Sequence, residues 1–349
     1  MVVPLYQKIS DDLKAQITTQ KLKAGDKLPT ELELSETYNV SRITAKHALS
    51  ALEQLGMITR SRGKGSFVSQ ELIDQSVPAT KSILFIQPFG DLSFGDFAQG
   101  LISEMKPLGY TVFITHAEFL NEATASEIMQ NFNGLIYYPM NTDAYLDILF
   151  EMVTLDFPVI LLDKEIYGLP FPCVKSDNFM GGLMATQHLI NEGHERIAFM
   201  MNQDAHPPHT TRDRYLGYMQ ALNKANLSFH THYNNPDESS LVVLDYLKKS
   251  KLTAMVCEND LIALSLMTTL QQAGISVPGE VSIIGFDNIQ AASLSNPPLT
   301  TIEQSFSALG EEAARLLLDW IQTSEVPTSN NITVQLIKRK TTKEIKHEH

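Results

Sequence analysis

From residue 82 onward, short apolar runs alternate with amphipathic segments along the chain. The apolar runs are rich in valine, isoleucine and leucine, which predicts buried strands, and the segments between them repeat apolar residues at helical spacing. Strands that alternate with helices form parallel sheets covered by helices on both faces, so we predict an α/β fold. The predicted strands are 82–87, 110–115, 134–139, 158–163, 196–201, 253–259 and 281–287, and the predicted helices include 96–108, 143–155, 213–225 and 260–273.

Residues 28–68 show a different pattern, which predicts two short helices followed by two extended runs. We expect Thr30 to cap the first helix and Ser41 the second, because a hydroxyl oxygen can accept a hydrogen bond from the first turn. The second helix carries its apolar residues on one face, and this face must pack inward. Those residues are Ala45, Ala48, Leu49, Leu52 and Leu55.

The outward face of the second helix and the extended runs after it are basic. If the apolar face packs inward, the first turn presents Arg42, Thr44 and Lys46 to solvent. The two extended runs, 57–61 and 65–69, form a two-stranded wing with a basic turn between them. A helix with such a wing is suited to a major groove and its flanking phosphates. The predicted contacts to double-stranded DNA are Thr30, Ser41, Arg42, Thr44, Lys46, Arg60, Arg62, Gly63 and Lys64.

Charge is distributed unevenly between the two parts of the chain. The formal net charge is −13, which is unfavourable for contact with DNA. Residues 1–70, however, carry ten lysines and arginines against seven aspartates and glutamates, a net charge of +3, whereas the remainder carries 17 against 33. Only the N-terminal part therefore attracts phosphate, and this asymmetry indicates nucleic-acid contact at that end.

Residues 4–68 resemble the winged-helix domain of the GntR family of bacterial transcription regulators. The resemblance implies a winged helix-turn-helix fold and DNA binding through the second short helix and the wing. Two positions depart from the family pattern: Leu32 replaces an arginine that usually touches phosphate, and Ala45-Lys46 replaces the more usual Val-Arg. The matching motifs are Pro4-Leu5-Tyr6, Gly25-Asp26-Lys27-Leu28-Pro29, Val40-Ser41-Arg42 and the run from Arg62 to Val68.

Polar residues follow three of the predicted strands of the α/β part. Asp163, Asn259 and Asp287 each stand at the end of an apolar run, where ligands bind to open parallel sheets. A sugar offers many hydroxyls, and the two carboxylates can accept several of their hydrogen bonds. Asn259 can both donate and accept. Asp163, Asn259 and Asp287 are therefore predicted to bind the effector.

Residues 82–340 resemble the LacI/GalR-type effector domain, which shares its two-lobed fold with periplasmic sugar-binding proteins. A GntR-type domain followed by this body resembles the AraR-type subgroup, which responds to sugars. The resemblance adds Arg214, which can donate as a planar fork, and Phe94, which it places against the ligand. The predicted effector site is therefore Phe94, Asp163, Arg214, Asn259 and Asp287. The first ligand loop, residues 88–97, departs from the usual pattern. The matching motifs are Val159–Asp163, Asp177-Asn178 with Gly181-Gly182, His188–His194, Arg214–Gly217, Asn259-Asp260, Gly285–Asn288 and Pro298–Ile302.

We divide the chain into a DNA-binding domain (1–70), a linker (71–81) and an effector-binding and dimerisation domain (82–349). The two cysteines, Cys173 and Cys257, lie in apolar contexts and suggest no disulfide framework. The N-terminus lacks a signal-like segment and no apolar run is long enough to cross a bilayer, so we expect a cytoplasmic protein without a membrane partner. No cofactor motif is found, and the paired histidines near 206–209, 230–232 and 347–349 lack the framework of a metal site.

Several alternative readings stay open from the sequence. Asp163, Arg214 and Asp287 could form a structural ion pair, and Asn259 could be a helix cap. The same architecture could sense a nucleoside or a sugar phosphate, although a phosphate would require more cationic groups than Arg214 alone. A sugar-binding protein without a regulatory role is a second class of function. An enzyme is not expected, because no hydrolase elbow, nucleotide loop or zinc-hydrolase spacing is present.

The sequence therefore predicts a sugar-responsive transcription regulator. Because one winged helix makes few base contacts, we expect a homodimer on a roughly palindromic operator. The resemblance places the dimer contact in the large domain and implies that the sugar closes two lobes. A repressor that its monosaccharide effector releases from DNA is the preferred interpretation. The sequence leaves open which sugar is bound and which operator is recognised.

Overall fold

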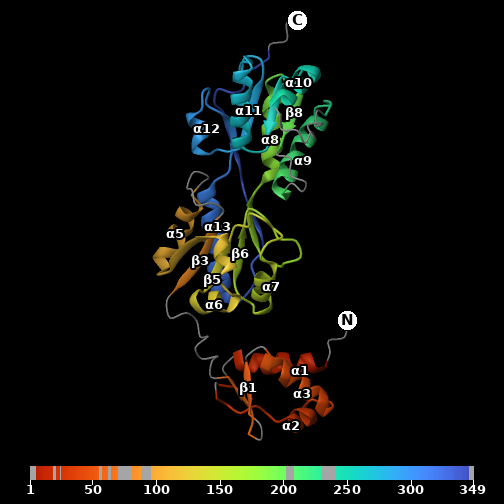
Figure 1. Cartoon of the computed structure of the whole chain (residues 1–349), viewed down its shortest axis with the longest axis vertical. Helices are drawn as coiled ribbons and strands as arrows, with labels where there is room; N and C mark the ends of the chain where they lie inside the picture. The colour runs from red at the N-terminus through yellow and green to blue at the C-terminus, as the bar shows by residue number, and fades with distance from the viewer. Residues whose placement is uncertain are drawn as a thin grey trace. The chain divides into compact units, whose positions relative to one another are not determined.

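A computed structural model describes residues 5–18, 21–23, 25–54, 57–61, 64–69, 81–87, 96–201, 208–229 and 240–345 (Figure 1). The chain divides into two compact units, one containing Met1–Thr80 and the other containing Lys81–Ile128 and Phe132–His349. Within the described residues, no helix is long and apolar enough to cross a membrane.

The N-terminal unit is a winged helix-turn-helix. It contains α1 (Leu5–Thr18), α2 (Glu31–Thr37), α3 (Arg42–Gln54) and the antiparallel pair β1 (Ile58–Ser61) and β2 (Gly65–Val68). Both predicted caps are confirmed. The Thr30 hydroxyl accepts from the Glu33 N–H while the Glu33 carboxylate accepts from the Thr30 N–H, and the Ser41 hydroxyl accepts from the Thr44 N–H at 3.1 Å. These caps fix where α2 and α3 begin.

The predicted inward face of α3 is buried. Ala45, Ala48, Leu49 and Leu52 are at most 1% exposed, and they pack with residues of the other helices and the wing. Leu55, the fifth member of the predicted face, lies outside the described residues. Burying this face leaves the opposite side of α3 free to contact another molecule.

The second unit has two lobes, each built on a largely parallel sheet. The sheet of the first lobe has the order β12-β7-β6-β5-β3-β4, and every neighbouring pair in it is parallel. Its strands are β3 (Ser82–Gln87), β4 (Thr111–His116), β5 (Gly134–Tyr137), β6 (Val159–Leu162), β7 (Cys173–Ser176) and β12 (Asn330–Ile332). Its helices are α5 (Phe97–Met105), the 3-10 turns η2 (Lys106–Leu108) and η3 (Ala117–Asn121), α6 (Ala125–Asn131), α7 (Leu146–Thr154) and α13 (Phe306–Thr323).

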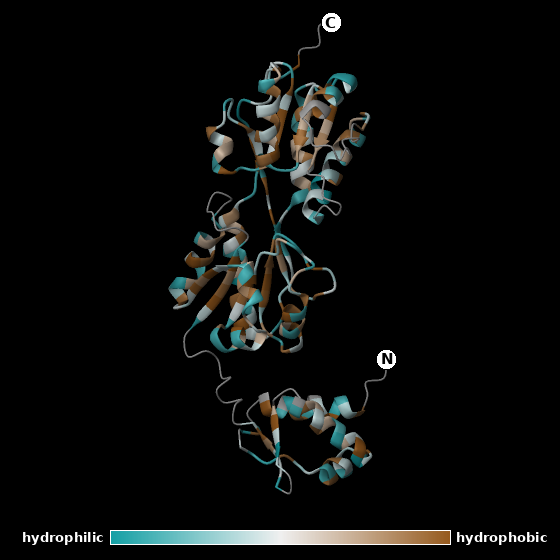
Figure 2. Cartoon of the chain, in the orientation of Figure 1, coloured by the Kyte–Doolittle hydropathy of each residue, from teal (hydrophilic) through white to brown (hydrophobic). Residues whose placement is uncertain are grey.

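The sheet of the second lobe has the order β13-β11-β10-β9-β8, in which only the β11–β13 pair is antiparallel. Its strands are β8 (Ile197–Met200), β9 (Ala254–Cys257), β10 (Ser282–Asp287), β11 (Thr300–Glu303) and β13 (Gln335–Ile337). Its helices are α8 (Asn178–Asn191), α9 (His209–Lys224), α10 (Ser240–Ser250), α11 (Asp260–Gln272) and α12 (Gln290–Leu294). Figure 2 shows the hydrophobic colour concentrated on the strands of both lobes.

The chain passes between the two lobes three times. The crossings join β7 to α8, β11 to α13 and β12 to β13, so each lobe is assembled from segments far apart in the sequence. Because all three crossings are short, residues at the ends of β7 and β11 are held at the junction of the lobes. The predicted two-lobed α/β fold with parallel sheets is confirmed.

Four further residues hold the scaffold of the second unit together. Trp320, in α13, is buried in the core at 7% exposure, and Asp177 caps α8 by accepting from the Met180 N–H. His188 and His194 anchor the C-terminal segment: His188 Nε2 lies 2.9 Å from Thr342 Oγ1, and His194 Nε2 lies 3.1 Å from the Lys343 carbonyl. These two histidines fasten the C-terminal segment to the second lobe.

Candidate functional site

Asp163, at the carboxyl end of β6, lies at the junction of the lobes. Its backbone is left-handed, with φ of 67°, and its side chain is buried. One carboxylate oxygen, Oδ2, accepts a hydrogen bond from the Tyr138 hydroxyl at 2.8 Å. The other oxygen, Oδ1, is buried and has no hydrogen-bond partner among the described residues. A buried carboxylate oxygen without a partner is costly, so this atom is poised to accept from a ligand.

Arg214, in α9, is buried and held on several sides. Its Nε donates to Asn178 Oδ1 at 2.7 Å, and one terminal nitrogen donates to the Glu258 carbonyl at 2.5 Å. The guanidinium lies 3.7 Å from the ring centroid of Phe286. These contacts fix the plane of the guanidinium and reduce the entropy lost when it binds a ligand.

Glycine positions this arginine by letting two helices approach closely. A Cβ atom on Gly182 of α8 would lie 2.0 Å from the Arg214 carbonyl oxygen, and one on Gly217 of α9 would lie 2.1 Å from the Phe179 carbonyl oxygen. Such distances are far inside van der Waals contact, so any larger residue at either position would push α8 and α9 apart. The two glycines therefore set the depth at which Arg214 enters the site.

Asp287 ends β10 beside the arginine. Its Oδ1 lies 3.5 Å from an Arg214 nitrogen and accepts from Gln304 Nε2 at 2.6 Å. Burial raises the pKa of the Asp287 carboxyl to about 8; Arg214 and Gln304 oppose this rise, while Asp260 and Asp163 add to it. The site thus holds a second carboxyl group whose protonation is sensitive to what binds next to it.

The same network reaches the crossings between the lobes. Gln304 follows β11 and its Oε1 accepts from the hydroxyl of Ser176, the last residue of β7, at 2.8 Å. Asn178 begins α8 directly after the first crossing and accepts from Arg214. Two of the three crossings are therefore hydrogen-bonded to the residues that hold Asp287 and Arg214. A ligand that moves these side chains would also move the junction.

His209 contributes a further atom without a partner. It is the first residue of α9, and its Nε2 is buried with no hydrogen-bond partner among the described residues. Burial lowers the pKa of His209; Lys175 adds to the decrease, whereas Glu165 and Asp163 oppose it. The imidazole is therefore neutral at neutral pH. Lys175 itself forms an ion pair with Glu165, so its charge is matched within the first lobe.

The structure thus brings Asp163, Arg214 and Asp287 together, as the sequence predicted. Asn259 caps α11 instead: its Oδ1 accepts from the Ile262 N–H at 2.9 Å, and its Nδ2 lies 3.3 Å from Glu258 Oε1. Its role as a ligand residue stays a prediction, and Phe94 lies outside the described residues.

Sequence reasoning missed four polar residues of this site. Tyr138 follows β5 and Gln304 follows β11, just as Asp163 follows β6. The position directly after a parallel strand was therefore a usable signal for both. Asn178 stands in a motif that matches the family but was not assigned to the site, and His209, the first residue of α9, gave no comparable signal. Their roles depend on which helices the fold places beside the site.

The predicted DNA contacts lie in the N-terminal unit. Arg42 and Lys46 are exposed on the outward face of α3, and Thr44 is half-buried there. Thr30 and Ser41 are exposed caps at the starts of the two short helices, and Lys64 is exposed at the tip of the wing. Arg62 and Gly63 lie outside the described residues.

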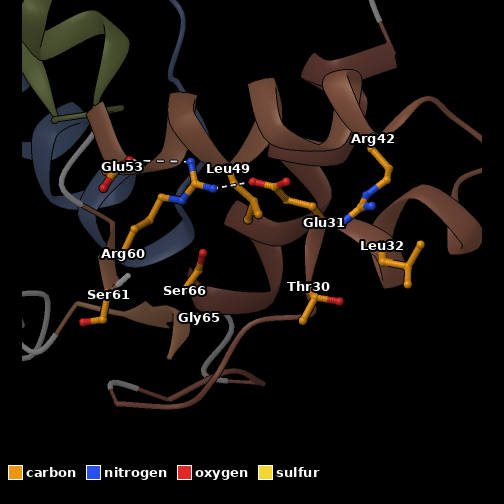
Figure 3. A pocket seen from close by; sticks show the side chains of 10 residues that line it. All are labelled: Thr30, Glu31, Leu32, Arg42, Leu49, Glu53, Arg60, Ser61, Gly65 and Ser66. Atoms are coloured by element: carbon orange, nitrogen blue, oxygen red, sulfur yellow. Dashed lines mark hydrogen bonds and ion pairs between the residues drawn. The ribbon is translucent and has the colours of Figure 1, made fainter. Parts of the chain in front are cut away.

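Arg60 differs from the other predicted contacts because it is already paired. Its guanidinium lies 2.5 Å from Glu31 Oε1 and donates to Ser50 Oγ at 3.2 Å, in a hollow between α2, α3 and the wing (Figure 3). A phosphate contact would have to compete with these partners. Elsewhere, no group of histidine, cysteine, aspartate and glutamate side chains among the described residues is arranged to hold a metal ion.

Comparisons with known proteins support the identification of both domains. The family described as "Bacterial regulatory proteins, gntR family" matches residues 5–68, and "Periplasmic binding protein-like domain" matches residues 186–342. An arabinose metabolism transcriptional repressor from Geobacillus stearothermophilus is 29% identical, with 98% of this chain and 99% of the relative covered. The HTH-type transcriptional repressor PurR of Pasteurella multocida (strain Pm70) is 28% identical, with 89% and 93% covered.

A solved structure supports the fold of the second unit. It is a LacI family transcriptional regulator from Enterococcus faecium with bound ribose, 27% identical, with a TM-score of 0.64 over 76% of this chain and 100% of that chain. The winged helix, the two-lobed body and these likenesses agree along nearly the whole chain. The chain is a DNA-binding transcription regulator that joins a gntR-family helix-turn-helix domain to a periplasmic binding protein-like domain.

Proposed function

We propose that this regulator is a repressor that binds a neutral sugar between its two lobes and leaves its operator when the sugar is bound. The observation that carries the proposal is that Asp163 Oδ1 and His209 Nε2 are buried without a hydrogen-bond partner among the described residues, within the group of interacting charges that also contains Arg214 and Asp287. A sugar hydroxyl can donate and accept at once and so satisfies both kinds of atom. The names of the arabinose repressor and of the ribose-bound regulator support this choice of ligand class.

The charges at this site favour an uncharged ligand over a phosphorylated one. Lys175 is paired with Glu165, and Arg214 already donates to Asn178 and to the Glu258 carbonyl. Asp163 adds a further acidic group. A phosphate would have to displace these partners and would lie near the carboxyl groups of Asp163 and Asp287, whereas the hydroxyl groups of a neutral sugar can hydrogen-bond to those groups. The alternative of a sugar phosphate is therefore disfavoured by the described residues.

Sugar binding can affect DNA binding through the connections between the lobes. Hydrogen bonds through Ser176 and Gln304 link the site to two crossings, so a sugar that pulls Asp163 and Arg214 together would alter the angle between the lobes. Control requires that the sugar bind one arrangement more tightly than the other, and moving an equilibrium from 1:99 to 99:1 takes about 5.5 kcal/mol of differential affinity. DNA recognition itself we assign to Arg42, Thr44 and Lys46 on α3. The protein would act in the cytoplasm, where its operator is.

A thermal-shift screen tests the ligand class. The purified protein is heated with arabinose, xylose, fucose, rhamnose, galactose or ribose, and in parallel with ribose 5-phosphate and adenosine. A ligand at 100 times its dissociation constant adds about 2.7 kcal/mol of stability, which raises the melting temperature by several degrees. We expect a neutral sugar to give the largest rise. A rise with ribose 5-phosphate or adenosine alone would contradict the proposed ligand class.

We propose further that the regulator is a homodimer joined through the first lobe. Four large apolar side chains are 40–49% exposed on neighbouring elements there: Ile102 on α5, Leu108 on η2, and Phe113 and Ile114 on β4. The strand β4 is an edge of the six-stranded sheet, so its outer backbone groups are also available for pairing. A second copy of the chain would bury this apolar surface, as symmetric dimers commonly do.

Replacing Phe113 with glutamate should separate the dimer into monomers, because each interface would then bury uncompensated charge. Sedimentation equilibrium of the purified proteins measures the change in mass. Phe150→Glu is the matched control. Phe150 is 62% exposed on α7, and this helix connects β5 to β6, neither of which pairs with the edge strand β4. A monomeric wild type, or a Phe113→Glu variant that stays dimeric, would rule out this surface.

A further inference from the structure

A hollow in the N-terminal unit lies between α2, α3 and the wing (Figure 3). Arg42 of the outward face of α3 lines one end of it, and Arg60 of β1 lines the other. On the proposed function, on which this inference rests, the surface that carries Arg42 faces DNA. With α3 in the major groove, the hollow would then face the DNA backbone that runs between α3 and the wing.

The guanidinium of Arg60 is held inside the hollow by two helices. Glu31 of α2 lies 2.5 Å from one terminal nitrogen, and Ser50 of α3 accepts from the other at 3.2 Å. Glu53, one turn further along α3, lies 3.9 Å from that second nitrogen. The Arg60 side chain is only 26% exposed, compared with the open setting of Arg42. Arg60 therefore ties the wing to both short helices.

The charges of this group do not favour a phosphate. Glu31 and Glu53 together carry two negative charges against the single positive charge of Arg60. A phosphate that reached Arg60 would displace Glu31 or lie beside both carboxylates, and like charges at such distances repel. The Arg60 guanidinium therefore does not contribute to the sequence-independent electrostatic attraction between the domain and DNA.

We propose that Glu31 holds Arg60 as a positioning residue of the wing and keeps it from contacting phosphate. This replaces the expectation from sequence that Arg60 contacts DNA directly. Removing one cation from the backbone contacts weakens binding to every sequence equally. The pairing of Arg60 with Glu31 therefore lowers the affinity for all DNA and leaves discrimination between sequences to the base contacts of α3.

The test uses the full-length protein and a labelled 30-base-pair duplex of random sequence, with anisotropy measured over a range of salt concentrations. In Glu31→Gln the carboxylate charge is lost and Arg60 becomes available to phosphate. We expect binding roughly five- to tenfold tighter at 0.1 M salt for each added contact, and a salt slope steeper by about 0.9 per domain. Glu36→Gln is the matched control, because Glu36 is exposed on the same helix and its loss changes the net charge equally.

Two further variants separate the explanations. In Arg60→Met the salt slope should equal that of the wild type, and in Glu31→Gln/Arg60→Met the gain of the single variant should disappear. A flatter slope in Arg60→Met would show that Arg60 already contacts phosphate and would overturn the proposal. Equal gains in Glu31→Gln and Glu36→Gln would overturn it too, since the effect would then be one of net charge. A wild type that binds no DNA would instead contradict the proposed function itself.

Discussion

Replacing Arg214 with alanine should abolish the response to the effector while leaving DNA binding intact. The arginine donates to Asn178 and to the Glu258 carbonyl and lies beside Asp287, so the alanine variant loses a fixed donor and leaves three buried acceptors short of a partner. Truncating one member of a buried, hydrogen-bonded charged pair costs 2 kcal/mol or more in binding, which corresponds to at least about 30-fold in affinity. Isothermal titration with the sugar measures this loss.

Two controls separate a binding role from a folding role. Arg212→Ala removes the same charge two residues earlier on α9, where the side chain is 64% exposed and lies 3.3 Å from Asp213. This variant should bind the sugar and release DNA as the wild type does. Arg214→Lys keeps a cation over Phe286 and should keep the fold, but it loses the planar fork and with it most of the affinity. An Arg214→Ala protein that still releases DNA in response to sugar would disprove the site.

Replacing Arg42 with alanine should weaken operator binding sharply without changing sugar affinity. Arg42 is the first residue of α3 and is exposed, so it can reach a base edge or a phosphate once the helix enters the groove. Each such contact is worth about 1–3 kcal/mol, and a dimer loses two of them. The measurement is the affinity for a duplex selected from a random library by the wild-type protein.

The matched control for Arg42 is Lys249→Ala. Lys249 is an exposed cation of α10, paired with Asp245, and its loss changes the net charge by the same amount. It should bind the selected duplex as tightly as the wild type. Unchanged affinity in Arg42→Ala would remove α3 from the recognition surface. A loss equal in both variants would mean that only the overall charge matters.

The regular elements could be predicted from the sequence because each is defined by local spacing. The caps at Thr30 and Ser41 and the inward face of α3 follow from neighbouring residues, and the structure confirms them. The predicted apolar strands are all present, and runs such as 159–162 are buried throughout. The strands that were not predicted contain polar residues or lie near the end of the chain, where they pair with strands distant in sequence. For example, β12 has the sequence Asn330-Asn331-Ile332 and exists because it pairs with β7 at the sheet edge.

The site could be predicted where a residue ends a strand or stands in a motif that resembles a known family. Asp163 and Asp287 end strands, and Arg214 was found through its resemblance to a family motif; the structure brings the three together. His209 could not be found, because only the packing of α8 and α9 and the crossings between lobes bring it to the site. The pairing of Arg60 with Glu31 was missed for the same reason, since it joins residues of β1 and α2.

The central claim is that a sugar bound between the lobes controls DNA binding at the other end of the chain. It is tested most directly by anisotropy of the selected operator duplex, titrated with the full-length protein with and without a saturating amount of the sugar found in the thermal-shift screen. The account predicts that the sugar weakens operator binding by at least about tenfold, equivalent to roughly 1.4 kcal/mol of coupling. Identical binding curves, with the sugar shown to be bound, would contradict it.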